Sequence, residues 1–242
     1  MKRIFKLGAL AAFGLLTLLA QDRTIQVRRQ FVVKRDRVGD FESSVKAILE
    51  VYKKAKVDAP TLTLQSITGE DHYITIRYYA KIADGLADRR AAFANNHEGE
   101  YMAANLRLAD TLDQRSTLVS RRDAEVSLPR TAEVPKFYRV VRTVVKPGQA
   151  DAYRALLKEL VEKGLKPGGV KAFTVLQPVA GGNAGEIVTG MGMNSLADLD
   201  DPPSIKAWGA ANYQEWLKRR AALIESTTVE IYRYRADLSN WQ

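Results

Sequence analysis

The feature that most constrains the fold of this chain is an internal repeat that covers two strand-helix-strand patterns. Residues 25–66 align without a gap on residues 137–178, at a constant offset of 112 residues. The run Val-Val-Lys at residues 32–34 falls on the same run at residues 144–146. A register that holds through a strand, a helix and a second strand predicts two structural units of one kind.

Length and composition suit two compact units. The chain has 242 residues, which leaves room for two domains of about 100 residues each and an N-terminal extension. Its 46% hydrophobic and 27% charged residues are ordinary for a globular protein. The net charge of +9 suits contact with acidic ligands or anionic surfaces. Because the chain has no cysteine, disulfides, thiolate metal sites and cysteine nucleophiles are excluded.

Residues 1–20 have the pattern of a secretory signal peptide, with a short cationic start and an uncharged run over residues 7–20. That run spans roughly 21 Å as a helix, whereas a bilayer core is roughly 30 Å thick. We expect cleavage near Ala20, with an uncleaved anchor as the alternative, and therefore an exported protein in the periplasm or outside the cell. The predicted divisions are a signal peptide at 1–20, repeat 1 at 21–128, a linker at 129–136 and repeat 2 at 137–242.

Hydrophobic periodicity gives each repeat the order β-α-β-β-α-β, which is typical of ferredoxin-like folds. Two such units in one chain can each cover the bare sheet face of the other. In repeat 1 the predicted strands are residues 25–33, 61–67, 73–82 and 116–126, with helices at 40–56 and within 83–113. In repeat 2 they are residues 137–145, 171–179, 186–193 and 227–234, with helices at 149–165 and 204–224.

With this element order, the repeat and the helix-to-strand ending WGAANYQEWLKRRAALIESTTVEIYRY, the chain resembles the dimeric α/β-barrel superfamily in a fused tandem form. That superfamily includes the antibiotic-biosynthesis monooxygenase-like domains. The resemblance covers residues 25–237 and implies an α+β fold, in which the antiparallel sheets of two tandem repeats pack into an intramolecular barrel. It includes no catalytic signature, and its members range from cofactor-free oxygenases to haem-handling enzymes and proteins without assigned activity.

Strand alternation predicts a polar pocket between the two sheets. In residues 73–82 we expect Ile74, Ile76 and Tyr78 to face the helices, which leaves Arg77 and Tyr79 facing the pocket. Arg77 and Arg142 together could hold a carboxylate or a phosphate. The alternative is that the pocket residues satisfy one another through Glu230 and bind nothing. The same logic assigns to the pocket Gln30, Gln65, Arg142, Gln177, Glu230 and Tyr232.

Few residues offer acid-base or aromatic chemistry. His72 falls in a predicted turn, where solvent exposure is expected, and His97 is a weak catalytic candidate with a capping role as its alternative. Trp208, a second weak candidate, shares a predicted helix with Tyr213 and Trp216. Beside Met191 and Met193 these rings could line a cavity for an aromatic ligand, although packing of the helix on its sheet explains them as well.

The sequence favours an exported protein that binds a small anionic or aromatic molecule without catalysis. One alternative is a cofactor-independent monooxygenase acting on an aromatic substrate, and another is an envelope scaffold that binds a partner protein. We expect no metal and no cofactor, because repeat 2 lacks the histidine that haem-binding relatives would need. Nucleic acid is not an expected partner, since paired arginines are scattered over different elements. No membrane span is expected after signal cleavage, and the oligomeric state stays open.

Overall fold

The computed structural model describes residues 23–57, 60–69, 72–87, 93, 96–129 and 133–241. The predicted signal peptide lies outside these residues, so export is untested. The first half contains β1 (Ile25–Val33), η1 (Arg35–Arg37), α2 (Val38–Lys54), β2 (Leu62–Ser66), β3 (His72–Tyr79), α3 (Ile82–Leu86), α4 (Glu98–Asp110) and β4 (Leu112–Arg122). The second half contains β5 (Phe137–Val145), α5 (Ala150–Leu160), η3 (Val161–Leu165), β6 (Phe173–Ala180), β7 (Glu186–Met193), α6 (Ala197–Asp200), α7 (Pro203–Trp208), α8 (Ala210–Leu223), β8 (Ile224–Tyr234) and η4 (Ala236–Leu238).

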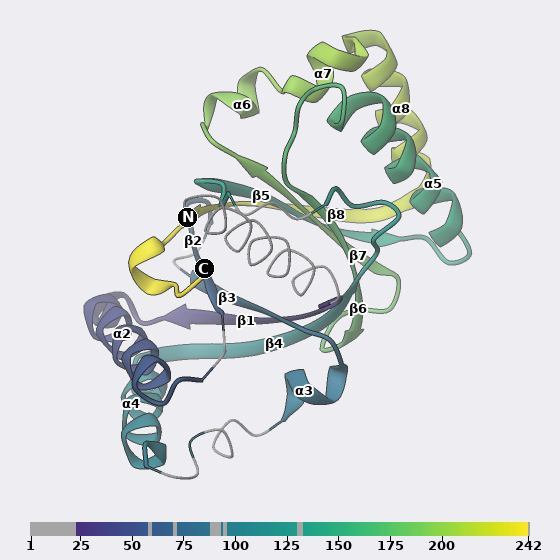
Figure 1. Cartoon of the computed structure of the whole chain (residues 1–242). Helices are drawn as coiled ribbons and strands as arrows, with labels where there is room; N and C mark the ends of the chain where they lie inside the picture. The colour runs from purple at the N-terminus through teal and green to yellow at the C-terminus, as the bar shows by residue number, and fades with distance from the viewer. Residues whose placement is uncertain are drawn as a thin grey trace, which may run out of the picture.

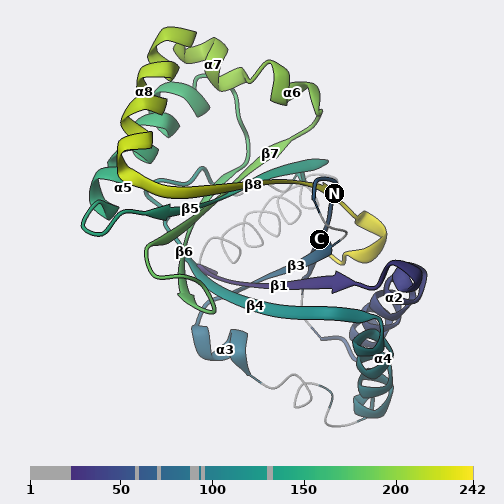
Figure 2. The ribbon, with the colours of Figure 1, turned by 180° about the vertical axis from the view of Figure 1, so that it is seen from behind.

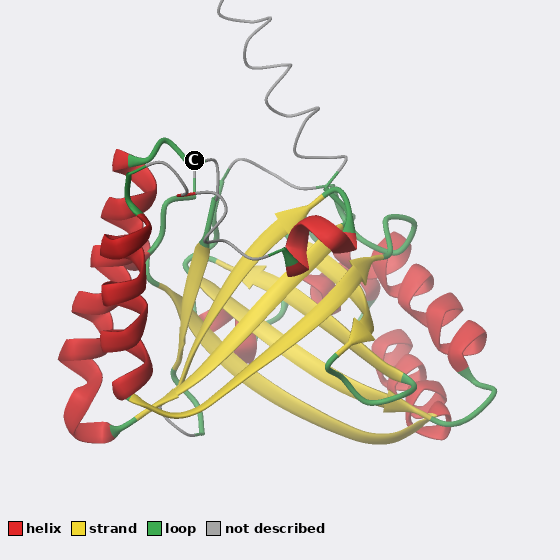
Figure 3. Cartoon of the chain, turned by 90° about the horizontal axis from the view of Figure 1, so that it is seen from below, coloured by secondary structure: helices red, strands yellow, loops and turns green. Residues whose placement is uncertain are grey.

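The eight strands form one closed antiparallel barrel in the order β1-β3-β2-β8-β5-β7-β6-β4. Each half supplies four neighbouring strands, and the halves join where β2 pairs with β8 and where β4 pairs with β6. The helices of the two halves lie on opposite outer sides of this barrel (Figures 1, 2 and 3). The predicted α+β fold of two tandem ferredoxin-like repeats that form an intramolecular barrel is therefore confirmed.

Two predicted helices differ in detail from the structure. The helix expected at residues 204–224 is divided into α7 and α8 by Gly209, whose φ of +86° ends one helix and begins the next. This left-handed conformation suits a residue without a side chain. The helix expected at residues 149–165 begins as α5 and ends in the π-helical turn η3.

Three apolar clusters explain how the layers pack. The first lies between α2, α4 and the outer face of the N-terminal strands, and includes Phe31, Phe41 and Tyr73. The second lies between the C-terminal helices and their strands, and includes Tyr153 and Trp216. The third occupies the barrel interior, where aliphatic side chains from both halves meet. The interior of the barrel is thus lined largely by apolar groups, as are the two helix-covered faces.

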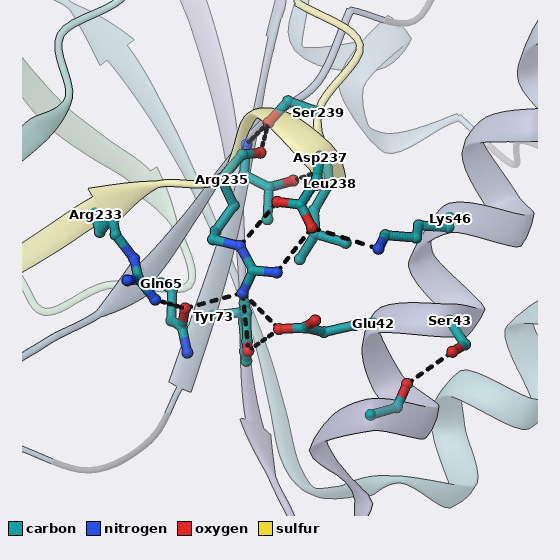
Figure 4. A network of polar contacts seen from close by, with 12 residues as sticks. Glu42, Ser43, Lys46, Gln65, Tyr73, Arg233, Arg235, Asp237, Leu238 and Ser239 are labelled. Atoms are coloured by element: carbon teal, nitrogen blue, oxygen red, sulfur yellow. Dashed lines mark hydrogen bonds and ion pairs between the residues drawn. The ribbon is translucent and has the colours of Figure 1, made fainter.

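The segment that follows β8 ties the C-terminal end of the chain to the N-terminal half. Arg235 donates hydrogen bonds to Asp237, Glu42 and Gln65, as Figure 4 shows. Its side chain is 15% exposed, and that of Glu42 is 22% exposed. Beyond this network Leu238 is fully buried in the N-terminal helix cluster. These contacts hold β8 beside β2 and thereby close the barrel.

None of the helices in the part of the chain that the structure describes is both long and apolar enough to cross a membrane.

Replacing Arg235 by methionine is expected to lower the free energy of unfolding by about 3 kcal/mol, because the largely buried Glu42 carboxylate loses its cation. Arg233→Met is the matched control, since the exposed Arg233 donates a single side-chain hydrogen bond to Gln65. For that variant we expect a change within about 0.5 kcal/mol. Urea denaturation followed by circular dichroism measures both, and equal losses in the two variants would contradict the role of Arg235.

Stability should also fall in acid through the same network. Hydrogen bonds from Arg235 lower the pKa of Asp237 to about 2, and they also lower the pKa of Glu42. Because these folded-state pKa values lie below the unfolded ones, which are about 4, the carboxylates stabilise the fold above that pH. This stabilisation is lost as the pH falls toward ~2. Unfolding free energies measured from about pH 5 to about pH 2 should drop more steeply for the parent protein than for Arg235→Met.

Candidate functional site

The inward side of the barrel is identified by the residues that line its central cavity. These come from six strands and include Arg28, Ile76, Val140 and Val188. Since side chains alternate along a strand, Gln30 lies on the inward side with Arg28, and Arg142 lies there with Val140. Glu230 and the fully buried Tyr232 likewise lie inside. The barrel therefore brings together Gln30, Arg142, Glu230 and Tyr232 of the predicted pocket.

The expected facing of β3 is wrong. Ile74, Ile76 and Tyr78 line the interior cavity, so Arg77 and Tyr79 point outward to the helices. The guanidinium of Arg77 lies 4.7 Å from the ring centre of Tyr52 on α2 and donates a hydrogen bond to Thr61. Tyr79 packs with the outer cluster of Ile25 and Val27. Because the barrel interior is mainly apolar, the apolar side of β3 lines it instead of facing helices.

Gln65 and Gln177 also lie outside the barrel, contrary to expectation. Gln65 alternates with the inward Leu64 and accepts hydrogen bonds from Arg233 and Arg235 on the outer surface. Gln177 is exposed and its amide lies 3.4 Å from Asp123. Both glutamines therefore belong to surface networks at the junctions between the halves.

An ion pair at the polar end of the barrel interior joins a buried carboxylate to a guanidinium whose side chain is 34% exposed. Arg142 Nε donates to Glu186 Oε1 at 2.6 Å, and the side chain of Glu186 is 2% exposed. Burial alone would raise the pKa of Glu186, but hydrogen bonds from Arg142 and from the amide of Asn183 lower it. Glu186 thus stays ionised and neutralises Arg142, one of the two arginines predicted to hold an anion.

His72 lies inside the barrel and not in a solvated turn as expected. It is the first residue of β3 and only 4% of it is exposed. Its Nε2 lies 2.7 Å from the hydroxyl of Tyr232 and 3.3 Å from Oε1 of Glu230. Burial, and then the charge of Glu230 against the opposing effect of Arg28, raises the pKa of Tyr232, so this hydroxyl stays protonated as a hydrogen-bond donor. The three groups form a satisfied polar network.

A second and larger cavity, of about 350 Å³, lies outside the barrel between the C-terminal strands and their helices. Its floor is the outer face of β5, β7 and β8, where Val141, Met191 and Val229 lie. Its roof is formed by α5, η3, α7 and α8, with Tyr213 and Trp216 among its residues. We call this space the C-terminal cavity. It is lined by aromatic, aliphatic and thioether groups that can contact a flat apolar ligand.

The aromatic side of the C-terminal cavity is rigidly held. The rings of Tyr213 and Trp216 stack with centres 5.6 Å apart and planes at 16°. Trp216 Nε1 donates to the carbonyl of Leu156 at 2.9 Å, which fixes α8 against α5. A preformed aromatic wall of this kind loses little conformational entropy when a ligand binds.

Two arginines give the C-terminal cavity a positive charge at each end. Arg220 donates to Thr143 and Thr227, so it is anchored at one end of β5. Arg139 also lines the cavity, and its side chain has no hydrogen bond or ion pair to another residue that the structure describes. Residues 139 and 143 are separated by about 13 Å of strand. Arg139 is therefore available to bind an anionic group at the other end.

The N-terminal half fills the corresponding space with its own side chains. Phe31 of β1 stands where the repeat places Thr143 of β5, and Phe31 packs on Phe41 with ring centres 5.6 Å apart. Tyr52, Phe93 and Tyr101 add stacked rings there. In the second half the smaller Thr143 is buried at this position, where it contacts the hydroxyl of Tyr153 and the guanidinium of Arg220.

The two weak catalytic candidates lie apart from each other. His97 is the N-cap residue of α4 in the N-terminal half, and its Nδ1 lies 3.4 Å from Glu100. It lines neither the interior cavity nor the C-terminal cavity. Trp208 ends α7 and packs with Tyr213 and Trp216 beside the C-terminal cavity. The expected partner Met191 lines that cavity, whereas Met193 does not.

Sequence reasoning missed Arg28, Arg139 and Arg220. Arg28 could have been found, because alternation places it on the same side of β1 as Gln30. Arg139 and Arg220 face the same cavity from a strand and a helix, and nothing in the sequence relates their positions.

Comparisons with known proteins show the fold. No protein-family model matches the chain, and no curated protein matches its sequence. A proposed monooxygenase of Lactobacillus acidophilus is 12% identical with a TM-score of 0.60, over 88% of this chain and 94% of that one. A chlorite dismutase mutant of Candidatus Nitrospira defluvii is 11% identical with a TM-score of 0.53, over 92% and 95%.

A haem-binding protein of Thermus thermophilus is 11% identical with a TM-score of 0.50, over 88% of this chain and 92% of that one. At such identities the likeness concerns the fold and not the activity. Together with the closed eight-stranded barrel, it shows that the chain has the dimeric α/β-barrel fold in its fused tandem form.

Proposed function

We propose that this protein is an exported binding protein for a small aromatic anion, which it holds in the C-terminal cavity without transforming it. The observation that carries the proposal is the pairing of a stacked aromatic wall, Tyr213 and Trp216, with the unpartnered Arg139 across one space of about 350 Å³ in the described part of the chain. Apolar pockets with a few convergent polar groups are the usual sites for small molecules. Export is proposed on the pattern of residues 1–20.

The ligand would lie beneath the C-terminal helices and not in the space between the sheets. The inter-sheet pocket was expected to use Arg77 and Arg142, but Arg77 lies outside the barrel and Arg142 is neutralised by Glu186. A ring system in the C-terminal cavity would contact Met191 and Trp216, while its anionic group would bind Arg139. Charge-assisted hydrogen bonds to a guanidinium favour carboxylates and sulfonates over neutral groups.

Haem, which one structural neighbour binds, does not fit this donor set. The described lining of the C-terminal cavity contains no histidine, and the chain has no cysteine. His72 is enclosed in the barrel and His97 lies on α4 of the other half. The axial ligands that most often hold haem are therefore missing from the cavity's described lining.

A monooxygenase acting on an aromatic substrate is the second candidate function, favoured by the fold shared with the proposed monooxygenase of Lactobacillus acidophilus. Such an enzyme would use the same C-terminal cavity, with Trp208 beside it. Asp198, at the edge of the cavity, is the carboxylate available there for proton transfer. An envelope scaffold would need neither cavity, and binding of a small molecule would argue against it.

The aromatic anion 2-naphthoate is a suitable probe, with 2-naphthamide as its neutral analogue. Quenching of tryptophan fluorescence should report binding of 2-naphthoate, and Arg139→Met should weaken it roughly tenfold or more, because one charged hydrogen bond is lost. Val229→Trp should block binding by filling the cavity from its floor. Arg121→Met, which removes an exposed arginine of β4 outside the cavity, should leave affinity unchanged.

Equal binding of the acid and the amide, or equal affinity in the parent protein and Arg139→Met, would overturn the proposed anion site. Oxygen consumption measured with an electron-rich hydroquinone separates the two candidate functions. A binding protein should consume no oxygen with this hydroquinone. Turnover that disappears in Val229→Trp would establish the monooxygenase instead.

A further inference from the structure

The barrel interior contains a separate cavity, of about 110 Å³, which we call the interior chamber. Its walls are mainly aliphatic and aromatic side chains from both halves, among them Leu64, Ile76, Tyr138 and Val188. Gly190 of β7 also faces it, and a Cβ atom placed on this glycine would meet nothing within 4 Å. The chamber is therefore open where the second repeat has a glycine in place of Ile76 of the first repeat.

Arg28 brings a buried positive charge to the wall of this chamber. The residue is 4% exposed, and its Nη2 donates to Gln30 Oε1 at 2.8 Å. Its Nη1 is buried and has no hydrogen-bond partner among the described residues. Burial lowers the pKa of Arg28, and the charge of Arg142 lowers it further, against the opposing effects of Tyr232 and Glu230. An unpaired buried charge costs several kcal/mol, so such groups normally have a counterion.

The carboxylates inside the barrel are engaged elsewhere. Glu186 accepts from Arg142 at 2.6 Å, and Glu230 lies 3.3 Å from His72. Glu133, the carboxylate that lines the chamber, forms an ion pair with Lys171 at 3.2 Å. No carboxylate of the described residues forms an ion pair with Arg28. The polar end of the barrel is thus satisfied by its own residues, whereas Nη1 of Arg28, a residue that lines the chamber, has no hydrogen-bond partner among the described residues.

We infer that the interior chamber is a second binding site, specific for a small monocarboxylate whose apolar body has about three or four carbon atoms. The carboxylate would bind Arg28 and the hydrocarbon would lie against Ile76 and Val188. An engineered apolar cavity of about 150 Å³ is known to hold benzene. The interior chamber is smaller, so the apolar group that it holds should be slightly smaller than benzene. The site is independent of the C-terminal cavity, which lies on the other side of the C-terminal strands.

Pentanoate is the probe for this site, with 1-pentanol as the neutral analogue and chloride as the anion without an apolar body. Isothermal titration calorimetry on the full chain should detect pentanoate, and should show binding at least tenfold weaker for pentanol and for chloride. Arg28→Met should reduce pentanoate affinity at least tenfold. Because this change replaces an unpaired buried charge by an apolar chain of similar length, the variant should fold.

Gly190→Val provides a second variant that keeps Arg28 and fills the open part of the chamber, and it should also reduce pentanoate affinity at least tenfold. Arg29→Met is the matched control, since this neighbouring arginine of β1 faces outward, and its affinity should match that of the parent protein. Equal binding in Arg28→Met and Arg29→Met, or equal binding of chloride and pentanoate, would overturn the inference.

These measurements distinguish loss of binding at one site from loss of binding at the other. Gly190→Val should still bind 2-naphthoate, because that probe occupies the C-terminal cavity. Val229→Trp should still bind pentanoate. Loss of both ligands in either variant would contradict the existence of two independent sites.

Discussion

Closure of the barrel is the constraint on which the other features of the structure depend. Each ferredoxin-like half alone would leave two sheet edges with unpaired backbone groups, and exposed edges favour aggregation. The halves remove these edges by pairing β2 with β8 and β4 with β6. Because β2 and β8 overlap over a short length, the chain beyond β8 continues beside β2, where Thr63 bonds to Ser239 and Leu238. Without this closure the interior chamber and the buried carboxylate of Glu186 would be open to water.

The two repeats differ in the side chains that occupy equivalent positions. On the outer face, aromatic rings pack under the N-terminal helices, whereas the C-terminal helices cover a cavity. On the inner face, the strand pairing relates Ile76 to Gly190, because these residues lie opposite Arg28 and Val140. Closely similar backbones therefore provide one filled helix-covered face and one hollow face. A structural repeat does not require the two halves to bind alike.

The fold was predictable from the sequence because its signals are local and repeated. Alternation in the strands and a constant offset between the repeats determine element order, and element order determines the barrel. The facing of β3 was not predictable, since both sides of this strand are buried and hydrophobicity no longer separates inside from outside. Arg77 shows the difficulty, because it lies among the aromatic residues under α2. The position of Gln30 was predictable, and Arg28 follows from it by alternation, but the unpartnered state of Arg28 depends on residues far away in sequence.

Arg28 and Arg142 are two charged residues in a barrel interior that is otherwise mainly apolar, and they differ in how their charge is balanced. Both arginines lie on the inward side of the barrel, and only Arg142 forms an ion pair with Glu186. The formal charges of Arg28, Arg142, Glu186 and Glu230 cancel, so the interior as a whole is not strongly cationic. The position of each charge matters more than the net charge, because in a medium of low dielectric constant an ion is stabilised mainly by its immediate partners. Glu230 already interacts with His72 and Tyr232, so Arg28 is best stabilised by an anion that enters from the chamber.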